Sequence, residues 1–404
     1  MVTDLNPARA WVVLGGIHLL NGTAPRGPVE PIVLIQVPPQ EVCVPSTTVV
    51  VPWARLGSCH VTALKTNGDE ITTGTIHGST LFPDAIAGHP LRTLVGEAAA
   101  PGLVPLCYLA ADPGGGYHVY AQIQFHAEDA CFVRTTREPV GAGAPPEALR
   151  WLESALAAHA AAALRLNNHQ RYFRTHFAGT ELEYKYNLTP QADIWAVSHA
   201  LLRALTHGDV PGCRPEYRQE FHNAYFDNHM FEVTGPEAER GYASLIPTAN
   251  GGHVLKRKWF DKDALARREQ IHHPAITVQP NGFAEYLRSD LGLQVRAMPP
   301  FHRVRYDVQC ESMATGHIYS IIFDRCSLLA APEVVLSQCE MEYRRSRSVV
   351  ERPESEVLDE MDRLHRWLLS YLSALGLTTE ATFYSKLSFL RDTLAERPDL
   401  TPLP

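Results

Sequence analysis

One short segment alternates charged and uncharged side chains, Glu181-Leu182-Glu183-Tyr184-Lys185. Because alternate side chains of a β-strand share a face, Glu181, Glu183 and Lys185 are expected to point the same way. Two carboxylates and an ammonium are costly to bury without partners, so such a face suits a wet cavity that holds a ligand. Taken alone, this pentapeptide fits a solvent-facing strand with a ladder of charges better.

The same spacing recurs later in the chain. Like-charged residues stand two apart in three further segments, Lys256-Arg257-Lys258, Arg303-Val304-Arg305 and Glu340-Met341-Glu342. Like charges on one strand face repel each other unless a metal ion or a phosphate lies between them. A β-barrel gives such pairs a common interior, because inward and outward side chains alternate along each strand. Acidic pairs there suit Mg²⁺ or Mn²⁺, and basic pairs suit phosphate oxygens.

The elements that would position these residues indicate an α+β fold. Strand-like segments are predicted at 181–188, 224–227, 253–260, 303–308, 318–323 and 334–343. Thr189-Pro190 is expected to open a helix over about 191–205, with Thr189 as the N-cap. Leu358, Met361 and Leu364 begin an apolar stripe on a second helix over about 354–375. Many strands, few helices and no regular strand–helix alternation favour an antiparallel sheet or barrel.

The first part of the chain has a different residue pattern, with strand-like runs and turn signals. Residues 1–145 are predicted to form a β-rich domain of unknown role, with strands at 31–37, 47–51 and 117–125 separated by turn signals. A linking helix is expected over 146–170. The charged segments described above then fall into a second domain, predicted over 171–395.

Composition narrows the classes of protein. The chain has 404 residues, 45% of them hydrophobic and 20% charged, which excludes a wholly disordered or collagen-like chain. Its formal net charge of −8 argues against general nucleic-acid binding, which needs a basic face. No run approaches the roughly 18 apolar residues of a membrane span. The eight cysteines form no CxxC pair, so we expect buried thiols in a cytoplasmic protein without membrane or nucleic-acid partners.

The order of the charged segments resembles the CYTH superfamily, the triphosphate tunnel metalloenzymes. The family's ExExK strand is matched by Glu181, Glu183 and Lys185, and its late ExE strand by Glu340 and Glu342. Other family features follow in order, namely YFDN at 225–228, LKRK at 255–258, RE at 268–269, a basic pair before Phe323-Asp324, and Ser385-Lys386. The resemblance covers Phe177–Leu390.

The resemblance implies an eight-stranded antiparallel tunnel with flanking helices and a charged interior. It implies divalent-metal ligands at Glu181, Glu183, Asp324, Glu340 and Glu342. It also implies phosphate-binding residues at Lys185, Lys256, Lys258, Arg303, Arg305 and Lys386. Glu181, Glu183 and Lys185 would then be catalytic, with Mg²⁺ or Mn²⁺ as the cofactor.

One family feature is missing. The family commonly carries an LRxR strand after its YFDT segment, whereas Phe231–Pro247 contains Arg240 as its only basic residue, in a loop-like context. We therefore expect one phosphate-clamping arginine pair to be absent or displaced. This departure makes an unusual phosphorylated substrate or a lost activity more plausible than it would otherwise be.

The leading hypothesis is a metal-dependent phosphohydrolase that acts on a triphosphate or another polyphosphorylated small molecule. Three alternatives remain open: a nucleotide cyclase of the same fold, a non-catalytic polyphosphate-binding protein, and a pathway-specific enzyme on an organic diphosphate. The sequence leaves a homodimer open.

Overall fold

The computed structural model describes residues 10–21, 30–38, 43–44, 47–81, 90–95, 103–141, 150–166, 173–260 and 265–402. The chain divides into two compact units. The N-terminal unit comprises Met1–Arg174 with Met313–Gly316 and Ser346–Arg352, and the C-terminal unit comprises the remainder. The predicted domain boundaries near 145 and 170 lie outside the described residues.

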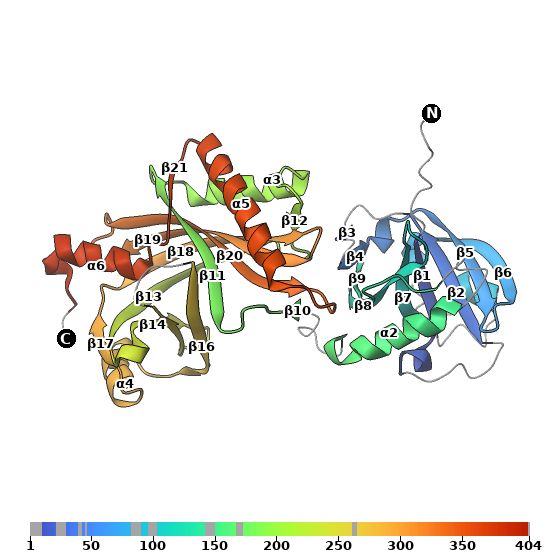
Figure 1. Ribbon diagram of the computed structural model, residues 1–404, viewed down its shortest axis with the longest axis horizontal. Coiled ribbons are helices and arrows are strands. Elements are labelled where there is room, and N and C mark those ends of the chain that lie inside the picture. The colour runs from blue at the N-terminus through green and yellow to red at the C-terminus, as the bar shows by residue number, and fades with distance from the viewer. Residues whose placement is uncertain are drawn as a thin grey trace. The chain divides into compact units, whose positions relative to one another are not determined.

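The described part of the N-terminal unit contains one antiparallel nine-stranded sheet with the order β3-β4-β9-β8-β7-β1-β2-β5-β6 (Figure 1). Its strands are β1 (Ala10–Gly16), β2 (Pro31–Val37), β3 (Cys43–Val44), β4 (Thr48–Val51), β5 (Ser58–Lys65), β6 (Glu70–His77), β7 (Leu103–Ala111), β8 (Tyr117–Phe125) and β9 (Ala130–Arg134). Its helices are α1 (Pro90–Val95) and α2 (Arg150–Leu166). The β-rich prediction for this part of the chain is confirmed.

Both faces of this sheet are buried at β1. Val12 and Leu14 of β1 belong to one apolar core, whereas Trp11 and Val13 pack with Trp151 of α2 in another. The alternation along β1 follows from the opposite directions of successive side chains in a strand. The proposed start of the linking helix before Arg150 lies outside the described residues.

The C-terminal unit is built on a closed eight-stranded antiparallel barrel, which confirms the predicted fold class. Going around the barrel, the strand order is β20-β19-β18-β13-β14-β15-β16-β11, and β11 pairs back with β20. These strands are β11 (Thr180–Thr189), β13 (Phe221–Gly235), β14 (Gly241–Pro247), β15 (His253–Trp259), β16 (Ala266–Ile276), β18 (Phe301–Ser312), β19 (His317–Leu328) and β20 (Val335–Arg347).

Shorter elements surround the barrel. The short strands of this unit are β12 (Cys213–Pro215), β17 (Gln294–Ala297) and β21 (Thr378–Thr382). Strand β10 (Phe173–Arg174) belongs to the N-terminal unit, where it pairs with Ser346 and Arg347 at the end of β20. The helices are α3 (Ile194–His207), α4 (Phe283–Ser289), α5 (Glu354–Ala374) and α6 (Lys386–Glu396). In Figure 1, α3 and α5 lie on the same side of the barrel strands, and α6 lies beyond β19.

The outward side chains of β11, β19 and β20 form the main apolar core with α3 and α5. Its members include Leu182, Tyr186, Phe323, Met341, Leu201, Leu205, Met361, Leu364, Leu368 and Leu372. The predicted helix over 354–375 is therefore present, but Val357 is buried while Leu358 is 43% exposed. The apolar contacts thus lie on one face of β11, and Glu181, Glu183 and Lys185 project from the other.

Helix α3 begins later than predicted. Strand β11 extends through Thr189, which pairs with Thr378 of β21, so Thr189 cannot act as the N-cap. The helix begins at Ile194, and the Asp193 side chain accepts a hydrogen bond from the Ala196 backbone N–H at 3.1 Å. Across the described residues, we find no helix with the length and apolar character of a membrane span.

Candidate functional site

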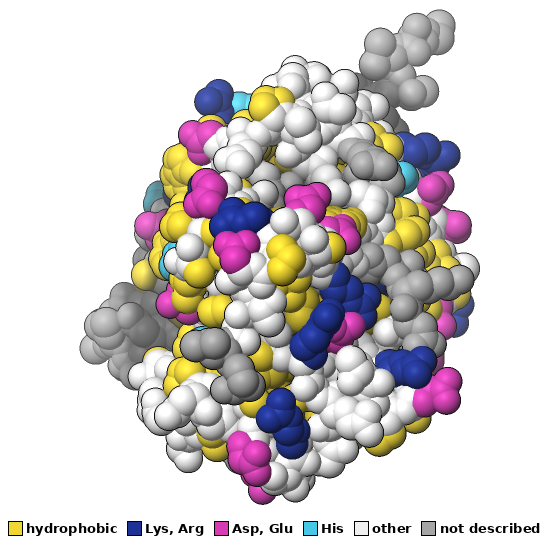
Figure 2. Space-filling model, turned by 90° about the vertical axis from the view of Figure 1, so that its left-hand side faces the viewer, with side chains coloured by type: hydrophobic (Ala, Val, Ile, Leu, Met, Phe, Trp, Pro, Cys, Tyr) yellow, Lys and Arg dark blue, Asp and Glu magenta, His cyan; other side chains and the backbone are white. Residues whose placement is uncertain are grey.

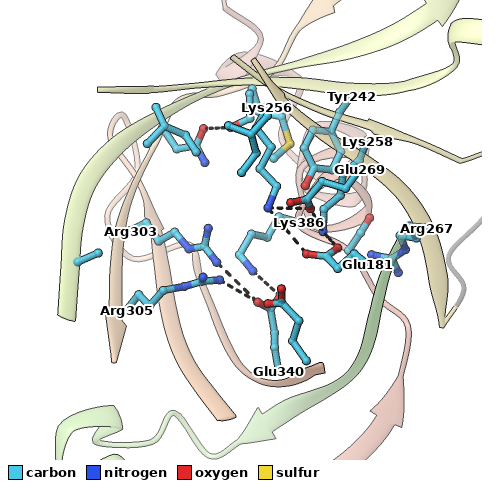
Figure 3. A pocket seen from close by; sticks show the side chains of 18 of the residues that line it. Glu181, Tyr242, Lys256, Lys258, Arg267, Glu269, Arg303, Arg305, Glu340 and Lys386 are labelled. Carbon is cyan, nitrogen blue, oxygen red and sulfur yellow. Dashed lines mark hydrogen bonds and ion pairs between the residues drawn. The ribbon is translucent and has the colours of Figure 1, made fainter. Parts of the chain in front are cut away.

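The inward side chains of the barrel enclose a cavity of about 260 Å³. Eight of the described lysine and arginine side chains line it, contributed by β11, β15, β16, β18, β20 and the start of α6: Lys185, Lys256, Lys258, Arg267, Arg303, Arg305, Arg344 and Lys386. On the outer face seen in Figure 2, basic and acidic side chains are interspersed. Figure 3 shows that inside the cavity the same two kinds of side chain point toward one another.

One group of cations, the arginine cluster, consists of Arg303 and Arg305 on β18 and Lys386 at the start of α6. Arg303 Nε donates to Asp324 Oδ1 at 2.9 Å, and Arg305 Nη2 donates to Glu340 Oε2 at 3.0 Å. Lys386 Nζ lies 3.0 Å from Asp324 Oδ2 and 2.8 Å from Glu340 Oε1. Two buried carboxylates from β19 and β20 therefore hold all three cations.

Asp324 is fully buried, yet it is held in its charged form. Burial by itself would raise the pKa of this carboxyl group, but Arg303 and Arg305 outweigh burial and keep the pKa well below its usual range. Arg305 stands directly opposite Asp324 in the β18–β19 register. The strand pairing thus fixes this ion pair.

A second group of cations, the lysine cluster, consists of Lys256 and Lys258 on β15 and Arg267 on β16. Lys256 Nζ lies 2.8 Å from Glu269 Oε2, and Lys258 contacts the carboxylates of both Glu181 and Glu269. Figure 3 shows this cluster on the side of the cavity away from Arg303 and Arg305. Burial would raise the pKa of Glu269, but the two lysines lower it to about 2.

Lys185 joins the two clusters. It lies directly opposite Glu340 across β11 and β20 and forms an ion pair with it. Its Nζ also donates to Glu183 Oε2 at 2.8 Å, and Arg267 Nη1 donates to the other oxygen of Glu183 at 2.8 Å. The buried charges therefore form one continuous network from β18 to β16.

Glu183 and Glu342 form a like-charged pair directly opposite each other on β11 and β20. Burial raises the pKa of the Glu342 carboxyl group, and the nearby Glu181 and Glu183 raise it further. Arg344, whose Nη1 lies 2.7 Å from Glu342 Oε1, lowers it. Opposed carboxylates on one face are unfavourable without a cation between them. Carboxylate oxygens are also the ligands that Mg²⁺ and Mn²⁺ prefer, so this donor set fits a divalent metal.

In the part of the chain that the structure describes, no three carboxylate, imidazole or thiol groups converge as a preformed metal site. The five predicted metal ligands fall into two sets. Asp324 and Glu340 are surrounded by the arginine cluster and Lys185, whereas Glu181, Glu183 and Glu342 are carried by β11 and β20 and do not converge on one point. The metal assignment for all five stays a prediction.

The remaining side of the cavity is uncharged. We call it the neutral wall, and it consists of the inward side chains of β13 and β14: Ala224, Phe226, Asn228, Met230, Tyr242, Ser244 and Ile246. The sequence predicts that the basic pair expected within Phe231–Pro247 is absent or displaced, and in the structure β14 presents the uncharged Tyr242, Ser244 and Ile246 to the cavity. Arg240 precedes β14 and does not line the cavity.

Nine of the predicted site residues line this one cavity: Glu181, Lys185, Lys256, Lys258, Arg303, Arg305, Glu340, Glu342 and Lys386. The other two, Glu183 and Asp324, are bonded to residues of the lining. The structure thus brings the whole predicted set together. Whether these residues bind metal and phosphate stays a prediction.

Arg267 and Arg344 line the cavity but are not among the site residues predicted from the sequence, in which Arg268 and Glu269 form the RE pair. In the structure Arg268 faces outward, with its guanidinium 4.3 Å from the Trp259 ring, whereas Arg267 faces inward. The signal was present in the spacing, because Arg267 and Glu269 stand two apart and therefore share a strand face.

Comparison with known proteins identifies no family for this chain. The sequence matches no protein-family model and no curated protein sequence. Among solved structures, a Hippeastrum protein described as an adenylyl cyclase with dominant triphosphatase activity is similar at 15% identity and a TM-score of 0.32, over 52% of this chain and 95% of the other. An S. pombe RNA triphosphatase is similar at 14% identity and a TM-score of 0.21, over 55% of this chain and 85% of the other.

Proposed function

We propose that the barrel is a metal-dependent phosphohydrolase of the triphosphate-tunnel kind, acting on a polyphosphorylated small molecule. One observation carries this proposal: eight cationic side chains from five strands and one helix line a single cavity. A cavity with this lining selects a compact, multiply charged anion. Phosphate oxygens suit it, because arginine binds them in bidentate fashion and lysine binds them as a point charge.

The carboxylates have two roles in this proposal. Glu181, Glu183 and Glu342 would hold Mg²⁺ or Mn²⁺, since their mutual repulsion is relieved by a divalent cation. Asp324 and Glu340 would position the arginine cluster and Lys185 through the ion pairs already described. A metal ion bound there supplies charge neutralisation of phosphate oxygens and a water of lowered pKa.

The chain's own residues account for binding and for stabilisation of the transition state. Arg303 and Arg305 would bind one phosphoryl group, and Lys256 and Lys258 another, on opposite sides of the cavity. Lys185 would contact the bridging region from its place between the two clusters. Preorganised cations in a site shielded from water stabilise developing negative charge more strongly than solvent does.

The test is orthophosphate release from a panel of inorganic and organic polyphosphates with Mg²⁺ or Mn²⁺. The proposal predicts release from at least one member, its loss with EDTA, and its loss in Glu181→Gln combined with Glu183→Gln. The matched control is Asp359→Asn, because Asp359 is exposed on α5 and does not line the cavity. Equal release by the double variant and the wild type would refute the proposal.

A further inference from the structure

Building on the proposed function, we propose that the substrate is an organic diphosphate whose non-phosphate group is compact, uncharged and partly apolar. The neutral wall on β13 and β14 would be the pocket for that group. The two cation clusters would take the two phosphoryl groups.

The strand order places the neutral wall between the two clusters. Around the barrel, β18 carries Arg303 and Arg305, β13 and β14 carry the neutral wall, and β15 carries Lys256 and Lys258. The carboxylate-bearing strands β11 and β20 complete the ring beyond β16 and β19. A ligand that reaches from β18 to β15 therefore meets an uncharged surface on one side.

The wall adjoins both clusters at the level of single side chains. The Arg303 guanidinium lies 6.0 Å from the centroid of the Phe226 ring. On the other side, Figure 3 shows Tyr242 beside Lys258 and Glu269. An aromatic face next to each cation cluster suits an organic group joined directly to a phosphate, and a ring can pack against it.

The middle of the wall is apolar with one polar spot. Met230 is 2% exposed, and half-buried Ile246 continues the apolar surface. Ser244 Oγ donates to Asn228 Oδ1 at 2.6 Å across the β13–β14 pair, so the hydroxyl hydrogen and the amide oxygen are paired. Such a surface excludes a third phosphoryl group, because a charge placed against it loses water without gaining a cation.

The size of the cavity limits the organic group. Pockets for drug-sized ligands run from about 300 to 1,000 Å³, whereas this cavity measures about 260 Å³. A diphosphate with a single ring or a short branched chain is therefore a better fit than a larger ester.

The experiment measures binding to the full chain by titration calorimetry with Mg²⁺, using probes whose P–C–P links are not hydrolysed. The probes are methylenediphosphonate, its phenyl ester, and the analogue of triphosphate in which methylene groups replace both bridging oxygens. The inference predicts that the phenyl ester binds at least tenfold more tightly than either of the other two.

Variants localise the effect. Phe226→Ala and Ile246→Ala are each expected to weaken the phenyl ester at least fivefold and to leave methylenediphosphonate unchanged. Ile246→Arg, which adds a cation to the wall, should reverse the order and favour the triphosphate analogue. The matched control is Tyr225→Ala, because Tyr225 neighbours Phe226 on β13 but is 57% exposed and does not line the cavity.

The outcomes separate this inference from the proposed function. Tightest binding of the triphosphate analogue, unchanged in Phe226→Ala, would overturn the organic-diphosphate inference while supporting a polyphosphate tunnel. Absence of binding by all three probes would overturn both.

Discussion

Glu183 and Glu342 face each other across β11 and β20 although a like-charged pair opposes folding. Lys185 and Glu340, the next pair on the same face, attract each other. Glu183 is held by Lys185 and Arg267, and Glu342 by Arg344. A divalent cation bound between the two carboxylates would relieve the repulsion that remains between them. The residue types and spacing of the two opposed pairs were visible in the sequence, but their pairing across strands was not.

Substitution of Glu342 tests this reading. Glu342→Gln removes one of two opposed carboxylates, so we expect an unchanged or higher melting temperature in EDTA and a loss of metal-dependent turnover of about tenfold or more. Thermal melts and orthophosphate release on the same preparation measure both. A lower melting temperature with unchanged turnover would contradict the assignment.

Ionisation of Glu269 is expected to make the stability of the fold depend on pH. Its folded pKa of about 2 lies below its ordinary value of 4.5, so its charged form stabilises the fold above pH 4.5. That contribution is lost as the pH falls from 4.5 through about 2. The melting temperature of Glu269→Gln should therefore lie below that of the wild type at pH 6, and the difference should shrink across this window. A difference that stays constant between pH 6 and pH 2 would rule out the Glu269 ion pairs as its source.

At the level of elements, strands were predicted correctly from the sequence where one face of the strand is charged and the other is apolar. Strand β11 is the clearest case, with Leu182 and Tyr186 in the core and Glu183 in the cavity. Strand β14 was not predicted because both of its faces are uncharged, which removes the two-residue alternation. Strand β16 was missed for the opposite reason, since its inward face is charged and its outward face includes polar residues such as Arg268 and Gln270. The helix start at Ile194 could not be predicted, because Thr189 belongs to β11 and pairs with Thr378, a residue far away in the sequence.

Helix α5 offers a matched pair of variants. Leu368 is fully buried, so Leu368→Ala should lower the free energy of unfolding by about 2–5 kcal/mol. Leu358 belongs to the same predicted stripe but is 43% exposed, so Leu358→Ala should change it by less than about 0.5 kcal/mol. Denaturant unfolding followed by circular dichroism measures both. Equal effects would mean that α5 packs through a different face.

At the scale of the C-terminal unit, closure of the barrel creates the site. Strand β11 pairs with both β16 and β20, and this double pairing brings Lys256 and Arg303 to the same cavity from strands that are not neighbours. A single sequence indicates that strands carry charged faces, but ring order depends on long-range pairings that no local pattern specifies. The neutral wall follows from the same closure, since its position between the clusters is set by the strand order.

Ligand linkage provides a test on the whole chain. Mg²⁺ or Mn²⁺ that binds only the folded state stabilises it by about 2.7 kcal/mol at a concentration of 100 times Kd. We therefore expect either ion to raise the melting temperature of the wild type and not that of Glu183→Gln. An equal rise in both proteins would place the metal elsewhere.

Phosphorus NMR shows whether this charged barrel cleaves polyphosphates. Purified protein with Mg²⁺ or Mn²⁺ would be followed over time with inorganic triphosphate, nucleoside triphosphates and organic diphosphates. We expect a growing orthophosphate resonance from at least one of these compounds, and EDTA should abolish it. Formation of diphosphate and a cyclic nucleotide would instead make the barrel a cyclase. Resonances that neither shift, broaden nor change in intensity with any member would contradict both binding and cleavage.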